Sequence, residues 1–307
     1  MLHTHSLSEL KLAKTHLTIG VFDGVHCGHQ KIISALTKDA KKNGATSLVI
    51  SFYPHPAAVL GKRQNVKYLT LPEEKAAILE KMGVDALLTH PFNQKVAAHS
   101  PKEFMKEILA HAKVEKLLIG YDFAFGKNRI GDADYLKSLG FELGYTLQTF
   151  QPISSGSAIV SSSRVRDALV CGRVRDAHQL LARPYTLSGS VIRGDGRGRK
   201  INIPTANIAI SAEKIVPKNG VYVTLAILNG VKHPAVTNIG IRPTFTPDKE
   251  RANIETHILD FDEEIYGEEL KLEFIAYLRD EKKFGSVEEL LKQIGEDIKK
   301  AEDLLRS

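Results

Sequence analysis

The sequence predicts an α/β domain with a doubly wound parallel sheet, followed by a small antiparallel β-barrel and a C-terminal helix. In residues 1–183, apolar runs alternate with segments of helical periodicity, the pattern of strands joined by crossover helices. In residues 184–307, short β-rich runs are separated by turn signals, which is typical of a small barrel. A length of 307 residues is comfortable for two such domains, and we place their boundary between residues 183 and 184.

The first domain is predicted to alternate strand and helix along its whole length. Apolar runs predict strands at 17–22, 46–53, 116–120 and 145–150, with a further apolar segment at 86–88. Helical periodicity predicts helices at 28–43, 72–82, 101–112 and 132–140. Strands of this kind are parallel, and ligands gather at their carboxyl ends. The residues that follow predicted strands there are Asp23, Pro54, His55, Gly120 and Asp122.

The second domain is predicted to be mostly β. Its runs are 186–192, 221–228, 234–239, 253–261 and 270–278. Ser286 then opens a final helix, with Glu289 completing a capping box. We expect one face of this helix to pack on another element, and its apolar residues are Val287, Leu290, Leu291, Ile294, Ile298, Ala301, Leu304 and Leu305.

Composition excludes several classes of protein. A hydrophobic content of 43% is enough for packed cores, whereas no apolar run approaches the roughly 20 residues of a membrane helix. The first residues lack a basic segment followed by an apolar one, so we expect no export signal. Cys27 and Cys171 are too few for a disulfide framework or a zinc cluster. We therefore expect a soluble, cytoplasmic protein.

The net charge of +6 is spread unevenly along the chain. Residues 1–183 carry a balance of +8, and residues 184–307 carry −2. A basic half raises the hypothesis of nucleic-acid binding. Its lysines are scattered along predicted helices, however, and the chain has no tryptophan. Solvated helix faces and attraction of polyphosphate explain the excess at least as well, so nucleic acid is disfavoured as a partner. The oligomeric state is left open.

The segment 18–30 is the most informative part of the chain. His26 and His29 lie where a strand passes into a helix N-terminus, and the glycines at 24 and 28 let the backbone approach a ligand. Such a helix end offers free N–H groups and positive potential, which suit phosphate. A zinc pair or a satisfied surface pair of histidines is the alternative, and the position directly after a strand favours phosphate.

This segment resembles the His-x-Gly-His signature of the nucleotidyltransferase superfamily. Its longer form, Gly-x-Phe-Asp-Gly-x-His-x-Gly-His-Gln, is similar to the bacterial bifunctional riboflavin kinase/FAD synthetases. The resemblance implies a Rossmann-like domain in which FMN phosphate attacks the α-phosphorus of ATP and pyrophosphate leaves. It implies that His26 and His29 stabilise the developing charge, aided by Mg²⁺ or a similar divalent cation. It also implies ATP contacts from Gly20, Phe22, Asp23 and Gly28.

Further segments of the first half match the same family. The stretch 120–132 resembles a family motif, which implies a flavin contact for Asp122. The stretch 161–166 resembles the second phosphate motif, which implies that Ser162 and Ser163 hold the β- and γ-phosphates with Arg166 as a charged clamp. The segment 51–56 also matches, but we assign it no chemistry. Cys27 is expected to be a small packing residue. The chain contains no P-loop pattern, so a P-loop enzyme is excluded.

In the second half, Pro-Thr-Ala-Asn at 204–207 resembles the riboflavin kinase signature. Thr205 and Asn207 are two residues apart, so in extended backbone their side chains project to one side. A hydroxyl and an amide oxygen are hard ligands suited to Mg²⁺. Ordinary strand-edge residues are the alternative. The preceding loop resembles a phosphate-binding one and implies ATP contacts for Gly194, Gly196 and Gly198.

The segments 216–222, 238–245, 254–261 and 278–284 match the kinase family in the same order. The resemblance implies that Glu255 is the catalytic base that accepts the proton of the ribityl 5′-hydroxyl, and that Arg279 faces the flavin. His257 is expected to be structural. Asn202 stands where the family usually has glycine. Asparagine tolerates left-handed backbone, so we expect the loop to persist and the kinase turnover to be altered.

The resemblance covers nearly the whole chain and implies an enzyme with ATP, riboflavin and FMN as small-molecule substrates. We expect the two sites to act largely independently. One alternative is a chain with a single live activity, the kinase having been silenced at Asn202. A second is a flavin-binding regulator that binds nucleic acid, and a third is a nucleotidyltransferase acting on pantetheine phosphate or a cytidylyl acceptor. Pyrophosphate release from ATP and FMN separates the proposed enzyme from the regulator, because a pure binder releases none.

Overall fold

A computed structural model describes residues 1–156, 158–194, 196, 198–201, 203–242 and 251–306. The chain folds into two compact units, Met1–Ser162 and Ser163–Ser307. The predicted boundary at 183/184 lies further along the chain. Helices α7 (Ser162–Val170) and α8 (Val174–Leu181) lie between the two positions, and α8 packs on the barrel strands. The boundary at 183/184 therefore remains a prediction about where the catalytic domains divide.

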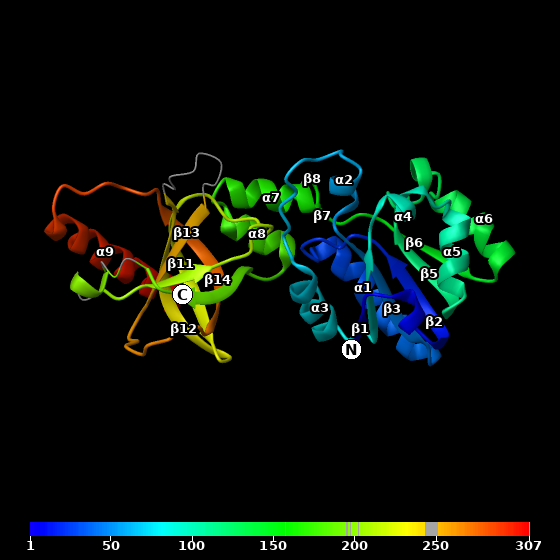
Figure 1. Cartoon of the computed structure of the whole chain (residues 1–307), viewed down its shortest axis with the longest axis horizontal. Coiled ribbons are helices and arrows are strands. Elements are labelled where there is room, and N and C mark those ends of the chain that lie inside the picture. The colour runs from blue at the N-terminus through cyan, green and yellow to red at the C-terminus, as the bar shows by residue number, and fades with distance from the viewer. Residues whose placement is uncertain (157, 195, 197, 202, 243–250, 307) are drawn as a thin grey trace. The chain divides into compact units, whose positions relative to one another are not determined.

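The first unit is a parallel sheet with helices on both faces (Figure 1). Its six sheet strands are β1 (Leu2–Thr4), β2 (Leu12–Ile19), β3 (Thr46–Tyr53), β4 (Ala86–Pro91), β5 (Ala112–Gly120) and β6 (Thr146–Phe150). Its helices are α1 (Cys27–Asn43), α2 (Pro56–Val59), α3 (Pro72–Lys81), α4 (Gln94–Ala98), α5 (Pro101–Leu109) and α6 (Ala133–Leu143). A short hairpin follows, β7 (Ser154–Ser155) with β8 (Ala158–Ile159).

The strand order of this sheet fixes where a ligand can enter. The order is β1-β4-β3-β2-β5-β6, and every neighbouring pair is parallel. The chain winds from β2 to β3 on one side and later returns to place β5 on the other side of β2. The order thus reverses between β2 and β5, and in open α/β sheets the crevice at such a reversal is the ligand site. The predicted doubly wound fold is confirmed.

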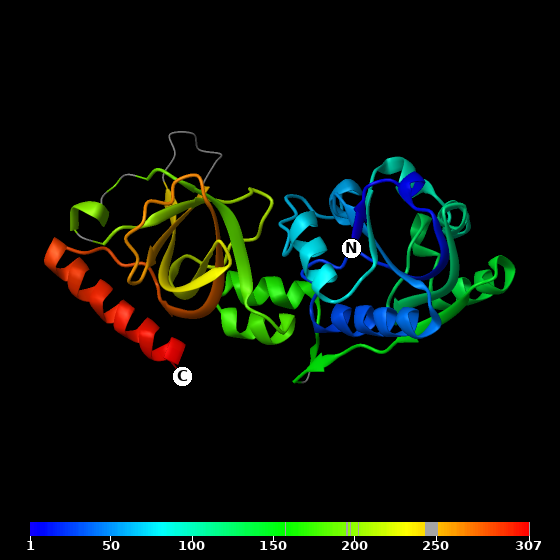
Figure 2. The same ribbon diagram turned by 90° about the horizontal axis from the view of Figure 1, so that it is seen from below.

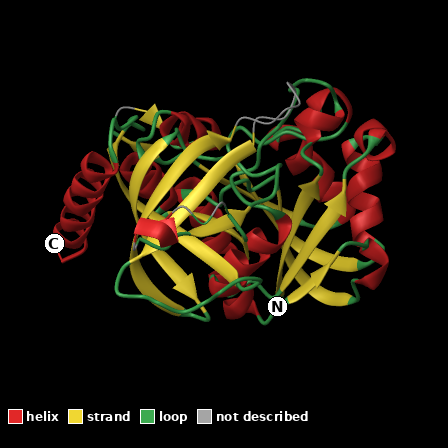
Figure 3. Cartoon of the chain, turned by 60° about the vertical axis from the view of Figure 1, so that its left-hand side comes forward, coloured by secondary structure: helices red, strands yellow, loops and turns green. Residues whose placement is uncertain are grey.

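Alternating side chains build a core on each face of the sheet. Leu48 and Ile50 of β3 face the core that α5 and α6 cover, whereas Val49 faces the core that α1 and α3 cover. Leu117 and Leu118 of β5 divide in the same way. Since strands buried on both faces need continuous apolar runs, this packing explains the apolar runs of the sequence. Figure 3 shows the strands of this sheet flanked by helices.

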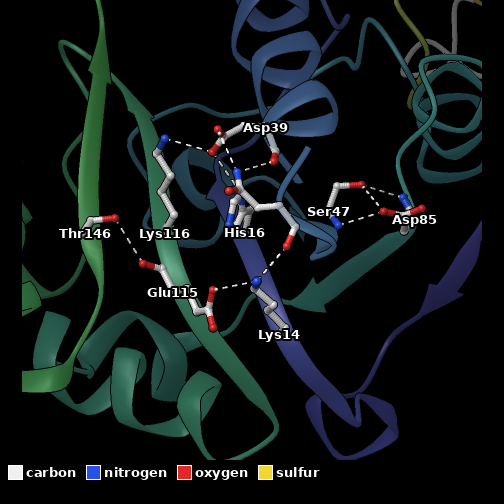
Figure 4. A network of polar contacts seen from close by, with 9 residues as sticks. Lys14, His16, Asp39, Ser47, Asp85, Glu115, Lys116 and Thr146 are labelled. Carbon is white, nitrogen blue, oxygen red and sulfur yellow. Dashed lines mark hydrogen bonds and ion pairs between the residues drawn. The ribbon is translucent and has the colours of Figure 1, made fainter. Parts of the chain in front are cut away.

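A polar network fixes α1 against the sheet from the end opposite to its N-terminus (Figure 4). The carboxylate of Asp39, near the end of α1, lies 3.1 Å from His16 Nδ1 on β2 and 2.9 Å from Lys116 Nζ on β5. Lys14 Nζ donates to the carbonyl of Asn43 at 2.7 Å. Because these contacts fix the C-terminal turns of α1, they also determine where its N-terminus points, which is toward the crevice.

The second unit is a closed barrel with helices outside it. Its strands, in barrel order, are β10 (Ala206–Ala209), β13 (Arg251–Ile258), β12 (Val231–Arg242), β11 (Gly220–Leu228), β14 (Glu269–Arg279) and β9 (Tyr185–Ile192). All neighbouring pairs are antiparallel, which confirms the predicted barrel. Tyr222 and Phe274 fill the interior with rings 5.2 Å apart. Three buried threonines, Thr224, Thr237 and Thr256, bond to one another across β11, β12 and β13.

The C-terminal helix α9 (Val287–Arg306) lies against one side of the barrel (Figure 2). Ala301 is fully buried with Val223 and Ala276, and Leu304 and Leu305 join the same cluster. The expectation that the whole apolar face packs is wrong, since Val287 is 51% and Leu291 37% exposed. Only the last turns of α9 reach the barrel cluster, and its middle is held by the ion pair between Arg279 and Asp297.

The element boundaries differ from the predictions at a few places. The run 17–22 was predicted as one strand, but β2 begins at Leu12 and ends at Ile19. Phe22 has a φ of +49°, which no strand residue adopts, so the end of the apolar run belongs to a turn. The short elements β1, α2, α4 and β10 and the helix α8 were not predicted. Each has at most eight residues, too few for a clear periodicity.

Candidate active sites

The first site is built on the turn that follows β2. Phe22, Gly24 and Val25 all have positive φ angles, of +49°, +80° and +40°. Such angles cost energy for a phenylalanine and a β-branched valine, so surrounding contacts must hold the turn in shape. Glycine is also needed at position 20, because a Cβ there would lie 2.9 Å from the ring of Phe22.

Asp23 is placed at the centre of this turn, but its carboxylate does not face the cavity. It is 2% exposed, and it accepts hydrogen bonds from the backbone N–H groups of Leu69 at 3.0 Å and Thr70 at 3.1 Å. The N–H of Gly24 donates to Thr70 Oγ1 at 3.0 Å. The side chain of Asp23 therefore fastens the turn to the segment before α3.

The two histidines lie together at the N-terminus of α1. Their rings are stacked, with centroids 3.6 Å apart and planes 19° apart. His26 is the N-cap, and its Nδ1 accepts a hydrogen bond from the backbone N–H of His29 at 3.4 Å. A Cβ at Gly28 would lie 3.1 Å from the His26 ring, so glycine lets this ring fold back over the helix end.

His29 has an unusual electrostatic environment. Burial, with the nearby His26 and Lys75 as smaller contributions, holds the pKa of His29 well below its ordinary value of 6.5. Its Nδ1 is buried and has no hydrogen-bond partner among the described residues. The ring is therefore neutral at pH 7 in the free protein, and because its Nδ1 is enclosed, we expect a ligand to meet Nε2.

A cavity of about 440 Å³ opens beside His29 at the sheet crevice. It is reached by residues that follow β2, β3, β4 and β5, as expected for a switch point. Besides Phe22, its aromatic wall consists of Phe52, Phe92, Phe104, Phe123 and Phe125. Its polar lining includes His29, His55, Asp122, Lys62 and Arg129. The predicted residues Gly20, Phe22 and Asp122 line this cavity, whereas His26 is buried behind His29.

The residues of the predicted second phosphate motif, 161–166, fall in two different units of the structure. Ser162 Oγ donates to the backbone carbonyl of Asp23 at 2.8 Å, which brings Ser162 to the turn. Ser163 and Arg166 follow on α7, whose residues after Ser162 belong to the second unit. Their role at the first site remains a prediction.

The second site surrounds a cavity of about 360 Å³ beside the barrel. The predicted residues Gly194, Gly196, Gly198, Thr205 and Asn207 all line it. A run of acidic residues, Asp262, Glu263 and Glu264, lines it as well. The predicted loop and the Pro-Thr-Ala-Asn segment are thus brought together around one space. Asn202 lies outside the described residues.

Asn207 is the most constrained of these residues. It is 7% exposed, and its Oδ1 has no hydrogen-bond partner among the described residues. A Cβ at Gly194 would lie 2.2 Å from Asn207 Nδ2, so glycine is required where the loop crosses the amide. A buried oxygen without a donor is costly unless a ligand or ion satisfies it.

Glu255 lies next to Asn207 through the strand register. Glu255 of β13 pairs directly with Asn207 of β10 on one side and with Asn238 of β12 on the other. Directly opposed residues of antiparallel strands place their side chains on the same face. The amide of Asn253 donates to Glu255 Oε1 at 2.8 Å, and that of Asn238 donates to Glu281 at 3.1 Å. The carboxylate of Glu255 is therefore held by the amide of Asn253, and Glu255 is not among the residues that line the cavity.

Arg279 and His257 have partners within the barrel unit. The Arg279 guanidinium donates from Nε at 3.0 Å and from Nη2 at 2.7 Å to Asp297 of α9, which is 2% exposed. This ion pair anchors α9. The flavin contact predicted for Arg279 has no support from this geometry and remains a prediction. His257 Nδ1 lies 2.8 Å from the carbonyl of Pro204, consistent with the structural role expected for it.

Some residues of these sites escaped the sequence analysis. Lys62 reaches the first cavity from a loop and Arg129 from a short 3-10 helix, Lys127–Arg129, and both look like ordinary surface charge in the sequence. Lys75 is a buried cation under the first turn, and no local pattern distinguishes it from the exposed lysines of other helices. Asn238 joins Glu255 only through the register of the barrel.

Comparisons with known proteins agree with both halves of this picture. The FAD synthetase family matches residues 8–164, and the riboflavin kinase family matches residues 181–305. The bifunctional riboflavin kinase/FMN adenylyltransferase of Bacillus subtilis is 38% identical over 302 residues, which cover 97% of this chain and 95% of that protein. The protein of the same description from Escherichia coli K12 is 35% identical and covers 95% and 93%.

A solved structure agrees with the fold. The protein from Streptococcus pneumoniae described as a macrolide-efflux protein has a TM-score of 0.88 and 28% identity, covering 96% of each chain. The chain is therefore a two-part transferase with a nucleotidyltransferase-like α/β unit and a kinase-like barrel. It belongs to the bifunctional riboflavin kinase/FMN adenylyltransferase family. No helix in the described part of the chain combines the length and apolar character that crossing a bilayer requires.

Proposed function

We propose that the two reactions of this family take place at the two cavities described above. The first unit would adenylylate FMN with ATP to give FAD and pyrophosphate, and the barrel would phosphorylate riboflavin with ATP to give FMN. The observation that supports this best is the meeting of separate motifs around each cavity: Gly20, His29 and Asp122 at one, and Gly194, Thr205 and Asn207 at the other. The substrates are small molecules, and we propose a cytoplasmic location.

In the adenylyl transfer, an FMN phosphate oxygen bonds to the α-phosphorus of ATP as the bond to the bridging oxygen of pyrophosphate breaks. Negative charge develops on the oxygens of the α-phosphate. His29, neutral in the free protein because of its lowered pKa, donates from Nε2 to this charge. His26 keeps the His29 ring in place by stacking on it and by capping α1. The N-terminal amides of α1 add further donors.

The shape of the first cavity suits a flavin. An isoalloxazine is a flat, largely apolar ring system, and the five phenylalanines offer it a wall. Lys62 and Arg129 line the same cavity and supply positive charge for a phosphate group. We propose that Asp122, at the carboxyl end of β5, contacts the polar part of the flavin. In-line positioning of two phosphates then contributes much of the rate.

At the second site, Glu255 accepts the proton of the ribityl 5′-hydroxyl while that oxygen attacks the γ-phosphorus of ATP and ADP leaves. Glu255 can do so because the register places it beside Asn207 and the amide of Asn253 holds one of its oxygens. The backbone N–H groups of Gly194, Gly196 and Gly198 would hold the phosphates.

The residues of the second site fit a divalent cation. Asn207 presents a buried oxygen without a donor, Thr205 adds a hydroxyl to the same cavity, and both are hard ligands of the kind that Mg²⁺ prefers. When bound, Mg²⁺ neutralises charge on the transferring phosphate. We propose Thr205 and Asn207 as its protein ligands.

Reciprocal inactivation tests the assignment. Purified protein is incubated with ATP, Mg²⁺ and either riboflavin or FMN, and the flavins are separated by chromatography over time. Glu255→Ala is expected to abolish FMN formation and to leave the conversion of FMN to FAD intact. His29→Ala is expected to stop FAD formation while riboflavin phosphorylation continues. Loss of both activities in either variant would contradict separate sites.

The same experiment separates the alternatives. A wild-type protein that converts FMN but leaves riboflavin untouched would have a silent kinase. A protein that releases no pyrophosphate from ATP and FMN would be a binder rather than an adenylyltransferase.

A further inference from the structure

Lys75 of α3 is buried under the turn of the first site and contacts its backbone. The side chain belongs to a residue that is 5% exposed. Its Nζ donates to the backbone carbonyl of Val21 at 2.7 Å and to Ser51 Oγ at 2.7 Å. Ser51 Oγ donates in turn to the same Val21 carbonyl at 2.9 Å. Two side chains from different elements, α3 and β3, therefore converge on one peptide oxygen.

That oxygen belongs to the peptide that controls the turn. The Val21–Phe22 peptide plane rotates about the N–Cα bond of Phe22, and that rotation is its φ angle of +49°. A bulky residue leaves the left-handed region unless its neighbours hold it there. The ring of Phe22 lies over Gly20 and packs edge-on against His29, with centroids 5.2 Å apart. Rotation of the peptide would thus displace a side chain that supports the histidine.

Burying the charged side chain of Lys75 at this position costs free energy. Burial lowers the pKa of Lys75 to about 8, although Asp23 nearby raises it. The titratable groups that face it are Asp23 of the turn and His29 of α1, a neutral ring whose own pKa Lys75 lowers. Because Asp23 also binds backbone amides, its charge is partly satisfied elsewhere. A buried apolar residue would pack without this cost, whereas an ammonium group adds positive potential where a triphosphate would bind.

We propose that Lys75 is a positioning residue of the adenylyl site, which fixes the Val21–Phe22 peptide and supplies buried positive charge to the triphosphate-binding turn. The inference rests on the proposed adenylyltransferase function of the first unit. It assigns Lys75 an effect on ATP use at the first cavity and none on the kinase.

The test compares Lys75→Met and Lys75→Arg with Lys81→Met, a matched control because Lys81 is an exposed lysine of the same helix. The rate of FAD formation from FMN is measured against ATP concentration, with riboflavin phosphorylation by the same sample as the internal control. We expect Lys75→Met to lower kcat/KM for ATP by about 100-fold, the scale of a 1 Å misplacement at a reacting centre. Lys81→Met and the kinase rates are expected to stay at wild-type values.

The rate of FAD formation is also measured from pH 7 to pH 10. A side chain that acted only through packing would not make this rate depend on pH. Wild type and Lys81→Met should lose FAD formation as the pH passes about 8, where Lys75 is deprotonated. Lys75→Arg should keep part of the activity without that alkaline fall, because arginine stays charged.

An unchanged kcat/KM in Lys75→Met, or a wild-type profile that stays flat to pH 10, would overturn the proposal. If the first unit of Lys75→Met fails to fold, the pH profile of the wild type tests the proposal instead. Failure of the proposed function itself is distinct, since the wild type would then form no FAD from FMN.

Discussion

At the scale of single residues, the first site depends on a turn that its own sequence does not favour. Phe22 and Val25 adopt positive φ angles, and side chains both of the turn and of later segments hold them there. Thr70 binds Gly24, Gln30 binds the Val25 carbonyl at 2.8 Å, and Asp23 binds the segment before α3. The carboxylate thus holds the turn in place, and the ATP contact predicted for Asp23 stays a prediction.

Asp23→Ala should destabilise the first unit by about 3 kcal/mol, because it leaves the buried N–H groups of Leu69 and Thr70 without acceptors. Asp23→Asn keeps one oxygen acceptor and should cost less, about 1 kcal/mol. Calorimetry of the full chain would show one lowered transition, and kinase activity that survives heating past it would assign that transition to the first unit. Equal melting of wild type and Asp23→Ala would refute this role.

At the scale of elements, α9 shows that an amphipathic pattern does not reveal what covers it. The apolar stripe runs the length of the helix, but only its last turns join the barrel cluster. Its middle is held by a charged contact from Arg279, the last residue of β14, to Asp297. At its start, the capping differs slightly from the prediction: Ser286 Oγ accepts from Glu289 N–H at 3.2 Å, and Glu289 accepts from Gly285 N–H at 3.0 Å.

Asp297→Ala is expected to destabilise the barrel unit by about 2 kcal/mol, since it removes the carboxylate that accepts from Nε and Nη2 of Arg279. Glu302→Gln on the same helix is the control. Its contact with Arg306 is a surface pair at 3.9 Å, and its loss should cost less than about 0.5 kcal/mol. Urea denaturation followed by the loss of kinase activity measures both. Similar midpoints for the two variants would mean that the Arg279 contact does not anchor α9.

At the scale of the whole molecule, the described histidines whose pKa is lowered lie in the first unit. His16, His29 and His90 are lowered chiefly by burial, and His3 by burial with His5 as a smaller cause. Each of them binds its proton less readily in the folded unit than in the unfolded chain.

Acid should therefore weaken the first unit before the barrel. As the pH falls below 6.5, the unfolded chain takes up protons that the folded unit refuses, so the free energy of unfolding of that unit decreases. The temperature of half-inactivation should fall further for FAD formation than for riboflavin phosphorylation between pH 7.5 and 5.5, measured on the same heated samples at a common assay pH. Parallel falls would contradict this distribution of the histidines.

The sequence by itself determined the order of strands and helices, because buried parallel strands and amphipathic helices impose periods that a short window reveals. It also determined the motifs at 18–30 and 204–207, whose residues are neighbours in the chain. Only the tertiary structure decided which distant residues meet. The β2/β5 reversal, the pairing of Glu255 with Asn207, and the approach of Lys75 to Val21 depend on strand register and helix packing, which couple residues far apart in sequence and leave no local pattern.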